Sequence, residues 1–173
     1  MAEIEHKLHE KVGELLEQFV KENSFIARLD SACGGDQYIP LFYAPKANAT
    51  CLCNVDAMLL KEVNGNKEVV AIIEIEESDI TPTNICGKYL TTALSSQYNH
   101  EKDGNIVLKP NSIKFIQIVD ASSETNDKKS QLINIGDLIR NKLCGCVRSY
   151  DIILANNNDL KNKLGTILNE ISK

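Results

Sequence analysis

Two glutamates end an apolar segment of the chain, and a third acid follows them directly. In the sequence "VVAIIEIEES", Glu74 and Glu76 are separated by one residue, and Glu77 comes next. Side chains alternate along a β-strand, so Glu74 and Glu76 would project from one face and Glu77, if still in the strand, from the other. Carboxylates gathered at the end of a buried strand suit hard divalent cations such as Mg²⁺ or Mn²⁺. The pattern therefore predicts a metal site that activates a bound water or neutralises charge on a phosphate.

A further acid, Asp56, lies alone in the apolar segment "NVDAMLL". The strand-like segments Cys51–Leu60 and Glu68–Glu76 flank the sequence "NGN", whose turn chemistry is typical of a hairpin. With a turn centred on Gly65, Asp56 would lie directly opposite Glu74, with Cβ atoms about 5 Å apart. Like charges in that position repel each other unless a cation lies between them. A slip of one residue in the register would break this alignment.

The elements that would position these acids alternate between helices and strands. Apolar residues from Ile4 to Val20 recur every three or four positions, which predicts an amphipathic first helix. Thr81, followed by Pro82, is expected to cap a second helix that extends to about Tyr98. The remaining predicted elements are a strand at Ile113–Val119, a helix carrying Leu132 to Leu143, a strand at Tyr150–Ala155 and a helix carrying Leu160 to Ile171. This order predicts an α/β fold with a mixed central sheet and helices on both faces.

The composition excludes some classes of protein. With 173 residues, of which 43% are hydrophobic, we expect a single domain over residues 1–173. No apolar segment approaches the ~20 residues that cross a bilayer, and the first residues are charged, so we expect a cytoplasmic protein that does not contact membranes. A formal charge of −5 gives no general attraction to nucleic acid, so such a site needs metal ions or a local basic patch. Candidates for such a patch are Lys128, Lys129, Arg140, Lys142 and Arg148, although a run of charges is more often a solvated face.

The segment "NVDAMLL", a turn, "VVAIIEIEES" and a following helix together resemble the core of the PD-(D/E)XK nuclease superfamily, which includes type II restriction endonucleases and junction-resolving and repair nucleases. The resemblance covers roughly two thirds of the chain, from the first helix to Val119. It implies a three-layer α/β/α restriction-endonuclease-like fold. It also implies an endonuclease that depends on Mg²⁺ or Mn²⁺ and hydrolyses DNA phosphodiester bonds, with DNA as partner. A homodimer is suggested, because many such nucleases cut both strands as dimers.

The resemblance also implies roles for individual residues. Asp56 corresponds to the first acid of the family motif and Glu74 to the second, and with Glu76 they would hold the metal and carry out catalysis. Glu76 stands where the family usually has a lysine. Some restriction enzymes look similar in having glutamate there, and other members recruit a lysine from the following helix. Lys88, about two turns into the predicted second helix, is that candidate, and its alternative is an ordinary solvated lysine.

The first helix of this family often contributes another acid. Periodicity places Glu5 and His9 inside the apolar arc of the predicted helix. The family's general position for the acid would suit Glu10 or Glu14 instead. The sequence leaves this choice open.

Two other interpretations concern the acids. A domain that kept the fold without catalysis, and binds nucleic acid or a protein partner, is favoured by the glutamate in place of lysine and by the acidic net charge. Alternatively, Glu74 and Glu76 protrude at a frayed strand end, and Asp56 pairs with a nearby lysine or arginine. Isolated acids within apolar strands rarely lack a partner, which argues for a site.

Two pairs of cysteines give a third alternative, a small zinc-binding structural protein. Cys51 and Cys53 form one CxC pair, and Cys144 and Cys146 form another. Structural zinc ligands are usually two to four residues apart, so this narrower spacing is a weak signal. We expect free, mostly buried thiols.

Overall fold

The computed structural model describes residues 7–156 and 158–173. These residues form four α-helices, a short 3₁₀ helix and nine β-strands. The helices are α1 (Lys7–Glu22), η1 (Asn48–Thr50), α2 (Pro82–Leu94), α3 (Asn126–Arg140) and α4 (Leu160–Ile171). The strands are β1 (Ile26–Leu29), β2 (Pro40–Phe42), β3 (Cys51–Asn54), β4 (Ala57–Val63), β5 (Asn66–Glu76), β6 (Gln97–His100), β7 (Gly104–Val107), β8 (Ile113–Asp120) and β9 (Val147–Ala155). Within these ranges, no helix combines the length and apolar character needed to span a membrane.

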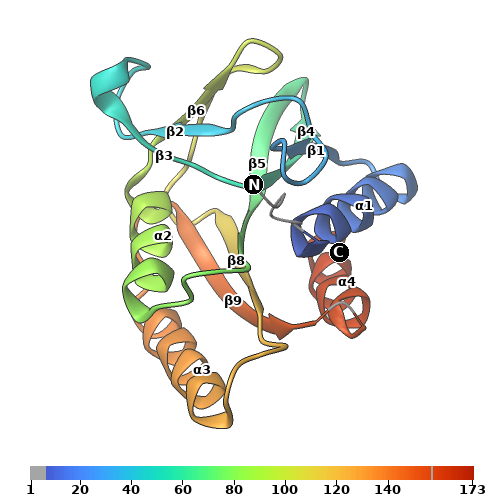
Figure 1. Cartoon of the computed structure of the whole chain (residues 1–173). Helices are drawn as coiled ribbons and strands as arrows, with labels where there is room; N and C mark the ends of the chain where they lie inside the picture. The colour runs from blue at the N-terminus through green and yellow to red at the C-terminus, as the bar shows by residue number, and fades with distance from the viewer. Residues whose placement is uncertain (1–6, 157) are drawn as a thin grey trace, which may run out of the picture.

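The main sheet has five strands in the order β1-β4-β5-β8-β9. The pairs β1–β4 and β4–β5 are antiparallel, whereas β5–β8 and β8–β9 are parallel, so the sheet is mixed as the sequence predicts. Helices α2 and α3 cover one face and α1 and α4 the other, as Figure 1 shows. On the first face Tyr89 of α2 packs in one cluster with Phe115 of β8; on the second, Leu16 of α1 packs in one cluster with Ile116 of β8.

The hairpin that carries the acids is formed by β4 and β5, but its turn differs from the predicted one. Val63 pairs with Asn66, which leaves a two-residue turn rather than a turn centred on Gly65. Asn64 and Gly65 have φ values of 53° and 76°, the positive angles that a type I′ turn requires. A β-bulge at Val70 then shifts the register by one residue, because Leu59 pairs with Ala71 and Leu60 with Val69.

The bulge compensates for the shorter turn. Beyond it, Ala57 pairs with Ile73, and continuing that register by one residue places Asp56 opposite Glu74. Asp56 and Glu74 are therefore aligned as predicted, although the pairing of the two strands near the turn differs from the predicted one. Because side chains alternate, one residue of shift would otherwise have placed the acids of the two strands on opposite faces.

The predicted strand Cys51–Leu60 is wrong as a continuous element. It breaks at Val55–Asp56 into β3 and β4, which belong to different sheets. The break follows the hydrogen bonds: the Val55 N–H donates to the carbonyl of Ile39, whereas the Asp56 carbonyl accepts from the N–H of Asp30. Asp56 therefore lies at the point where the chain passes between sheets.

A second sheet of four antiparallel strands, β3-β2-β6-β7, is absent from the sequence-based prediction. The predicted second helix is correct at its start, where the Thr81 hydroxyl accepts the N–H of Asn84, but it ends at Leu94 rather than near Tyr98. Tyr98 belongs to β6, pairs with Leu41 and is fully buried. Burial of this aromatic side chain in the second sheet outweighs the helical spacing that the sequence offers.

One buried acid joins the two sheets. Asp103, between β6 and β7, has a side chain with 0% exposure. Its carboxylate accepts two hydrogen bonds from Arg28 of β1 at 2.6 and 2.7 Å and lies 2.6 Å from Lys67 Nζ of β5. The hydroxyl of Tyr98 donates to it at 2.9 Å. Burial alone would raise the pKa of Asp103, but the bonds from Arg28 and Lys67 more than offset this and lower it well below its ordinary value.

Candidate active site

The carboxyl end of β5 brings two glutamates into the interior. Glu74 and Glu76 are only 2% and 6% exposed, and both project toward the face covered by α2. Ile73 and Ile75 alternate with them and pack in the cluster on the opposite face, together with residues of α1 and α4. This alternation fixes the direction of the acids, because turning the strand over would bury both carboxylates in the apolar cluster beneath α1 and α4.

Asp56 is held against the same strand end. Its Oδ2 accepts the backbone N–H of Ile75 at 2.6 Å. A charge-assisted bond of this length fixes one carboxylate oxygen and the position of the chain between β3 and β4. The structure therefore brings together the three acids that the sequence singled out as metal ligands.

Lys88, the predicted replacement for the family's lysine, lies at the centre of these acids. Its Nζ is 2.9 Å from Glu74 Oε2, 3.1 Å from Glu76 Oε1 and 3.7 Å from Asp56 Oδ2. The carbonyl oxygen of Ile75 is 3.5 Å from the same nitrogen. Lys88 is thus no ordinary solvated lysine, because four oxygen atoms from the strand end and from Asp56 surround one positive charge.

The donor set fits a hard divalent cation. All four groups around Lys88 Nζ offer oxygen, which Mg²⁺ and Mn²⁺ prefer. Glu74 Oε2 and Glu76 Oε1 are inaccessible to solvent and, despite their ion-pair distances to Lys88, accept no hydrogen bond of regular geometry in the described chain. The acids are spaced around an ammonium group: in residues 7–156 and 158–173 no three acidic, histidine or cysteine side chains are already spaced as a metal site.

Burial and charge act in opposite directions at these acids. Burial raises the pKa of Glu74 well above its ordinary value; Lys88 opposes this shift, and the charge of Asp56 adds to it. Burial likewise raises the pKa of Glu76, and Lys88 again opposes the shift. Burial would lower the pKa of Lys88, but the surrounding carboxylates more than offset that effect and raise it. A cation at this point therefore favours the ionised form of both acids, against the effect of burial.

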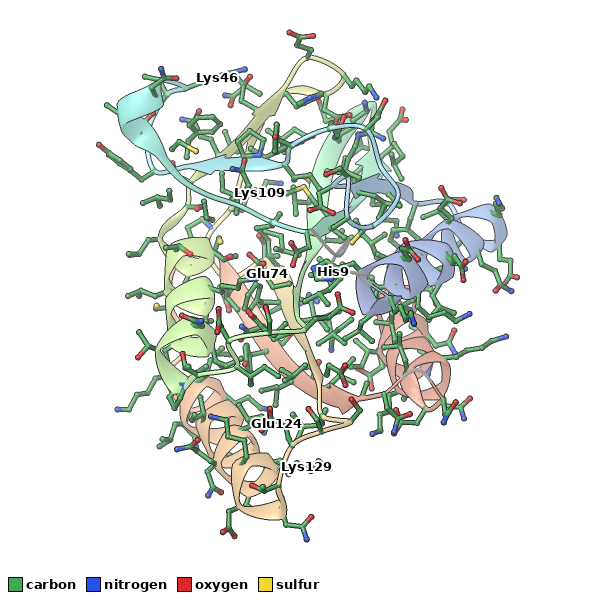
Figure 2. The ribbon with its side chains drawn as sticks, in the orientation of Figure 1. His9, Lys46, Glu74, Lys109, Glu124 and Lys129 are labelled. Carbon is green, nitrogen blue, oxygen red and sulfur yellow. The ribbon has the colours of Figure 1, made fainter. Side chains whose placement is uncertain are left out.

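Helix α1 contributes His9 from the other side of the sheet end. His9 Nδ1 lies 2.6 Å from Glu77 Oε2, and its Nε2 lies 3.8 Å from Asp56 Oδ2. Glu77 Oε1 also accepts the backbone N–H of Leu8 at 2.6 Å, so one carboxylate holds both the start of α1 and the histidine ring. Figure 2 shows His9 of α1 and Glu74 of β5 at the centre of the molecule, between α1 and α2.

Among the first-helix candidates, the structure brings His9 to the site. Glu10 and Glu14 are exposed, and Glu14 pairs with Lys11 at 3.2 Å on the outer surface of α1. Glu5 lies outside the described residues. The helical periodicity of the apolar residues thus places this helix better than the general family position does.

Two neighbours of the site are missing from the sequence-based prediction. Glu77 was expected only to face away from Glu74 and Glu76, and the structure shows it holding His9. Gln117 of β8 pairs with Glu74 in the sheet, is fully buried and accepts the hydroxyl hydrogen of Tyr150 at 2.7 Å. Its Nε2 has no hydrogen-bond partner in the described chain, which leaves a buried donor beside Glu74. A single amide within the apolar segment "IKFIQIV" was the available signal.

The site opens to solvent along helix α2. A depression of about 390 Å³ is lined by Glu76, Thr83, Asn84, Gly87, Lys88 and Thr91. Gly87 has open space where a Cβ would be, so the surface beside Lys88 is shallow and unobstructed. An extended substrate could reach Lys88 and the edge of Glu76 from this side without entering an enclosed pocket, whereas Glu74 and Asp56 do not line the depression.

The cysteine pairs stand apart from this chemistry. All six cysteines are free thiols, and the described residues contain no cluster of cysteine and histidine with metal-site spacing. Cys51 and Cys144 are exposed, whereas Cys146 is buried and donates its thiol hydrogen to the carbonyl of Thr92 at 3.2 Å. The expectation of mostly buried thiols is wrong, because Cys51, Cys86 and Cys144 are exposed and only Cys33 and Cys146 are buried.

No protein-family model, curated protein or solved structure matches the chain. The interpretation of the site therefore depends on its geometry and on the chemistry of its side chains.

Proposed function

We propose that this chain is a metal-dependent endonuclease with a restriction-endonuclease-like fold, and that it hydrolyses phosphodiester bonds of DNA. One observation carries the proposal. At the end of a central strand, the ammonium group of Lys88 is surrounded by oxygen atoms of Asp56, Glu74, Glu76 and the Ile75 carbonyl. A mixed sheet with helices on both faces supports the fold. The open surface along α2 suits a polymer rather than a small enclosed substrate.

Asp56 and Glu74 would hold Mg²⁺ or Mn²⁺ in this proposal, with the Ile75 carbonyl and Glu76 as further oxygen ligands. When bound, the ion would lower the pKa of a coordinated water and neutralise charge that develops on the phosphate. Lys88, whose side chain is 33% exposed, has room to turn toward the depression along α2 and stabilise negative charge there.

Two further side chains support these acids. Glu77 fixes the Nδ1 side of His9, so Nε2 is directed toward Asp56. At 3.8 Å this contact with Asp56 is electrostatic rather than a hydrogen bond, and side chains that lie behind a ligand in this way help to orient it. On the other side, the buried amide of Gln117 provides a donor next to Glu74.

The test is calorimetric titration of Mn²⁺ into the wild-type protein and the Asp56→Asn variant, followed by cleavage of plasmid DNA with Mg²⁺ or Mn²⁺. We expect saturable binding and cleavage in the wild type, and loss of both in the variant. Asp127→Asn is the matched control, because it makes the same change at an exposed residue of α3. Cleavage that survives Asp56→Asn with unchanged metal dependence would refute the site.

A second candidate is a non-catalytic domain that binds nucleic acid, and Lys88 is the observation that favours it. An ammonium group among three carboxylates can neutralise them without a metal. In that case the wild type would bind no Mn²⁺, even with DNA present, while DNA would still bind in EDTA. The titration above, repeated with a phosphorothioate DNA duplex, separates the two candidates.

A further inference from the structure

A groove of about 550 Å³ lies away from the acids, along the first half of β5. It is larger than the depression beside Lys88, and none of the candidate active-site residues lines it. Strands β4, β5 and β9, the segment between β7 and β8, and the end of α4 contribute to its wall. The residues that matter for its chemistry are Phe25, Lys61, Glu68, Val70, Lys109 and Arg148.

Both register irregularities of the main sheet fall at this groove. Val70 is the extra residue of β5, opposite Leu59 and Leu60. Arg148 is the extra residue of β9, because Ile113 pairs with Val147 and Lys114 with Ser149. A β-bulge turns a side chain away from its regular direction and is common beside functional sites. Here both of the bulged residues line one hollow.

The groove is positive although the chain carries a net charge of −5. Four basic residues line it, against two acids. Both acids are already neutralised, since Glu68 pairs with Lys109 and Glu170 pairs with Lys114 at 3.1 Å. Lys61 and Arg148 have no acidic partner within the described chain.

An aromatic and aliphatic surface lies beside these charges. Lys61 Nζ lies over the Phe25 ring, 5.7 Å from its centre, and Phe19 stacks on the same ring at 5.3 Å, so Phe25 offers its edge to the groove beside a positive charge. Val107 is 63% exposed and Ile171 lines the same wall. A volume of this size is within the range of small-molecule sites.

We propose that this groove binds a nucleotide, with its phosphate at Arg148 and Lys61 and its base against Phe25 and Val107. A guanidinium group binds phosphate through paired hydrogen bonds, and the edge of Phe25 together with the exposed Val107 gives a base an apolar surface to pack against. The nucleotide is either free or part of a single DNA strand. The proposal goes beyond the nuclease function and does not depend on it, because the groove shares no residue with the acidic site.

The experiment is titration of ATP into the full chain by calorimetry, in EDTA and in buffer without phosphate, so that no metal bound at the acidic site contributes. We expect Arg148→Ala to weaken binding about tenfold or more, the loss typical of a charge-assisted contact. Lys129→Ala is the control for overall charge, because Lys129 lies on α3, far from Lys109 in Figure 2. Thermal unfolding of each variant shows that the fold is retained.

A fluorescent single-stranded DNA oligonucleotide, titrated under the same conditions, identifies the source of the phosphate. Binding of ATP that depends on Arg148 supports a free nucleotide. Binding of the oligonucleotide alone, with the same dependence, supports a nucleotide within a strand. Absence of both, or equal weakening by Arg148→Ala and Lys129→Ala, overturns the proposal and leaves the nuclease proposal intact. Retained binding in Asp56→Asn would show that the two sites are separate.

Discussion

Lys88 Nζ lies 2.9 Å from Glu74 Oε2, and the two residues come from different elements, α2 and β5. The ion pair joins the helix to the strand end at the point where burial raises the pKa of Glu74. Removing a charge from a buried group of this kind leaves its partners uncompensated. A cation among these acids therefore stabilises the folded chain, and either an ammonium group or a divalent ion can supply that charge.

Replacing Lys88 by methionine tests this competition. In EDTA, we expect Lys88→Met to lower the free energy of unfolding by about 2 kcal/mol, below the usual cost of breaking a buried pair because Lys88 is one third exposed. With Mn²⁺ present, we expect the melting temperature of the variant to rise more than that of the wild type, since no ammonium group competes for the acids. Lys161→Met, at an exposed position of α4, is the control. An equal rise in melting temperature with Mn²⁺ in all three proteins would contradict competition between Lys88 and the metal ion.

Glu77→Gln tests the support that α1 gives to the site. The amide has one acceptor oxygen, so with that oxygen on the Leu8 N–H its NH₂ group meets His9 Nδ1 only as a donor, and the negative charge beside the ring is lost. We expect the free energy of unfolding to fall by about 1–2 kcal/mol. We also expect DNA cleavage to fall by about 10–100-fold, the usual effect of removing a group that orients a ligand. Glu14→Gln, at an exposed acid of the same helix, should change neither urea unfolding nor cleavage.

Elements with a long regular pattern could be predicted from the sequence, and short ones could not. The four helices and the buried strands β5, β8 and β9 carry periodic or continuous apolar residues, which burial against the sheet requires. Strands β6 and β7 have only four residues each and mixed exposure, so no period can be recognised. The helix prediction extended to Tyr98 because its apolar side chain also fits helical spacing, and only pairing with Leu41 places it in β6.

The candidate site shows the same limit. Asp56 and Glu74 are aligned as predicted, but through a shorter turn and a bulge at Val70. Nothing in the local sequence specifies that bulge. Helical periodicity favours His9, because it depends only on spacing within α1. The contact of His9 with Glu77 depends on how α1 sits against the sheet, which is a matter of packing in three dimensions.

Asp103→Asn tests the link between the two sheets through pH. A lowered folded-state pKa means that the carboxylate stabilises the fold above its unfolded value of about 3.9 and that this contribution is lost as pH falls below it. We expect the variant to be less stable by about 3 kcal/mol at pH 7, because Arg28 and Lys67 lose their partner. Between pH 5 and pH 3 the difference should narrow by about 1 kcal/mol. Urea unfolding of both proteins at each pH measures this difference in stability. A difference that stays constant with pH would contradict the lowered pKa of Asp103.

Replacing either of two helical glycines by alanine should change the free energy of unfolding, but in opposite directions. A Cβ at Gly13 of α1 would come 1.9 Å from the carbonyl oxygen of Cys33, so the helix packs against that segment only without a side chain. A Cβ at Gly165 of α4 would meet nothing within 4 Å. We expect Gly165→Ala to raise the free energy of unfolding by about 0.5–1 kcal/mol, the gain from helix propensity. Gly13→Ala should instead lower it by about 3 kcal/mol, since backbone atoms must move.

Gly13→Ala should also weaken Mn²⁺ binding, because α1 carries His9 and a shift of this helix moves the ring away from Asp56. Urea unfolding and calorimetric Mn²⁺ titration of both alanine variants measure the two effects separately. Gly165→Ala changes stability on a helix that contributes no residue to the site, so its Mn²⁺ affinity should equal that of the wild type. If Gly13→Ala loses stability but keeps full Mn²⁺ affinity, the position of α1 does not matter for the metal site, and the support assigned to His9 is wrong.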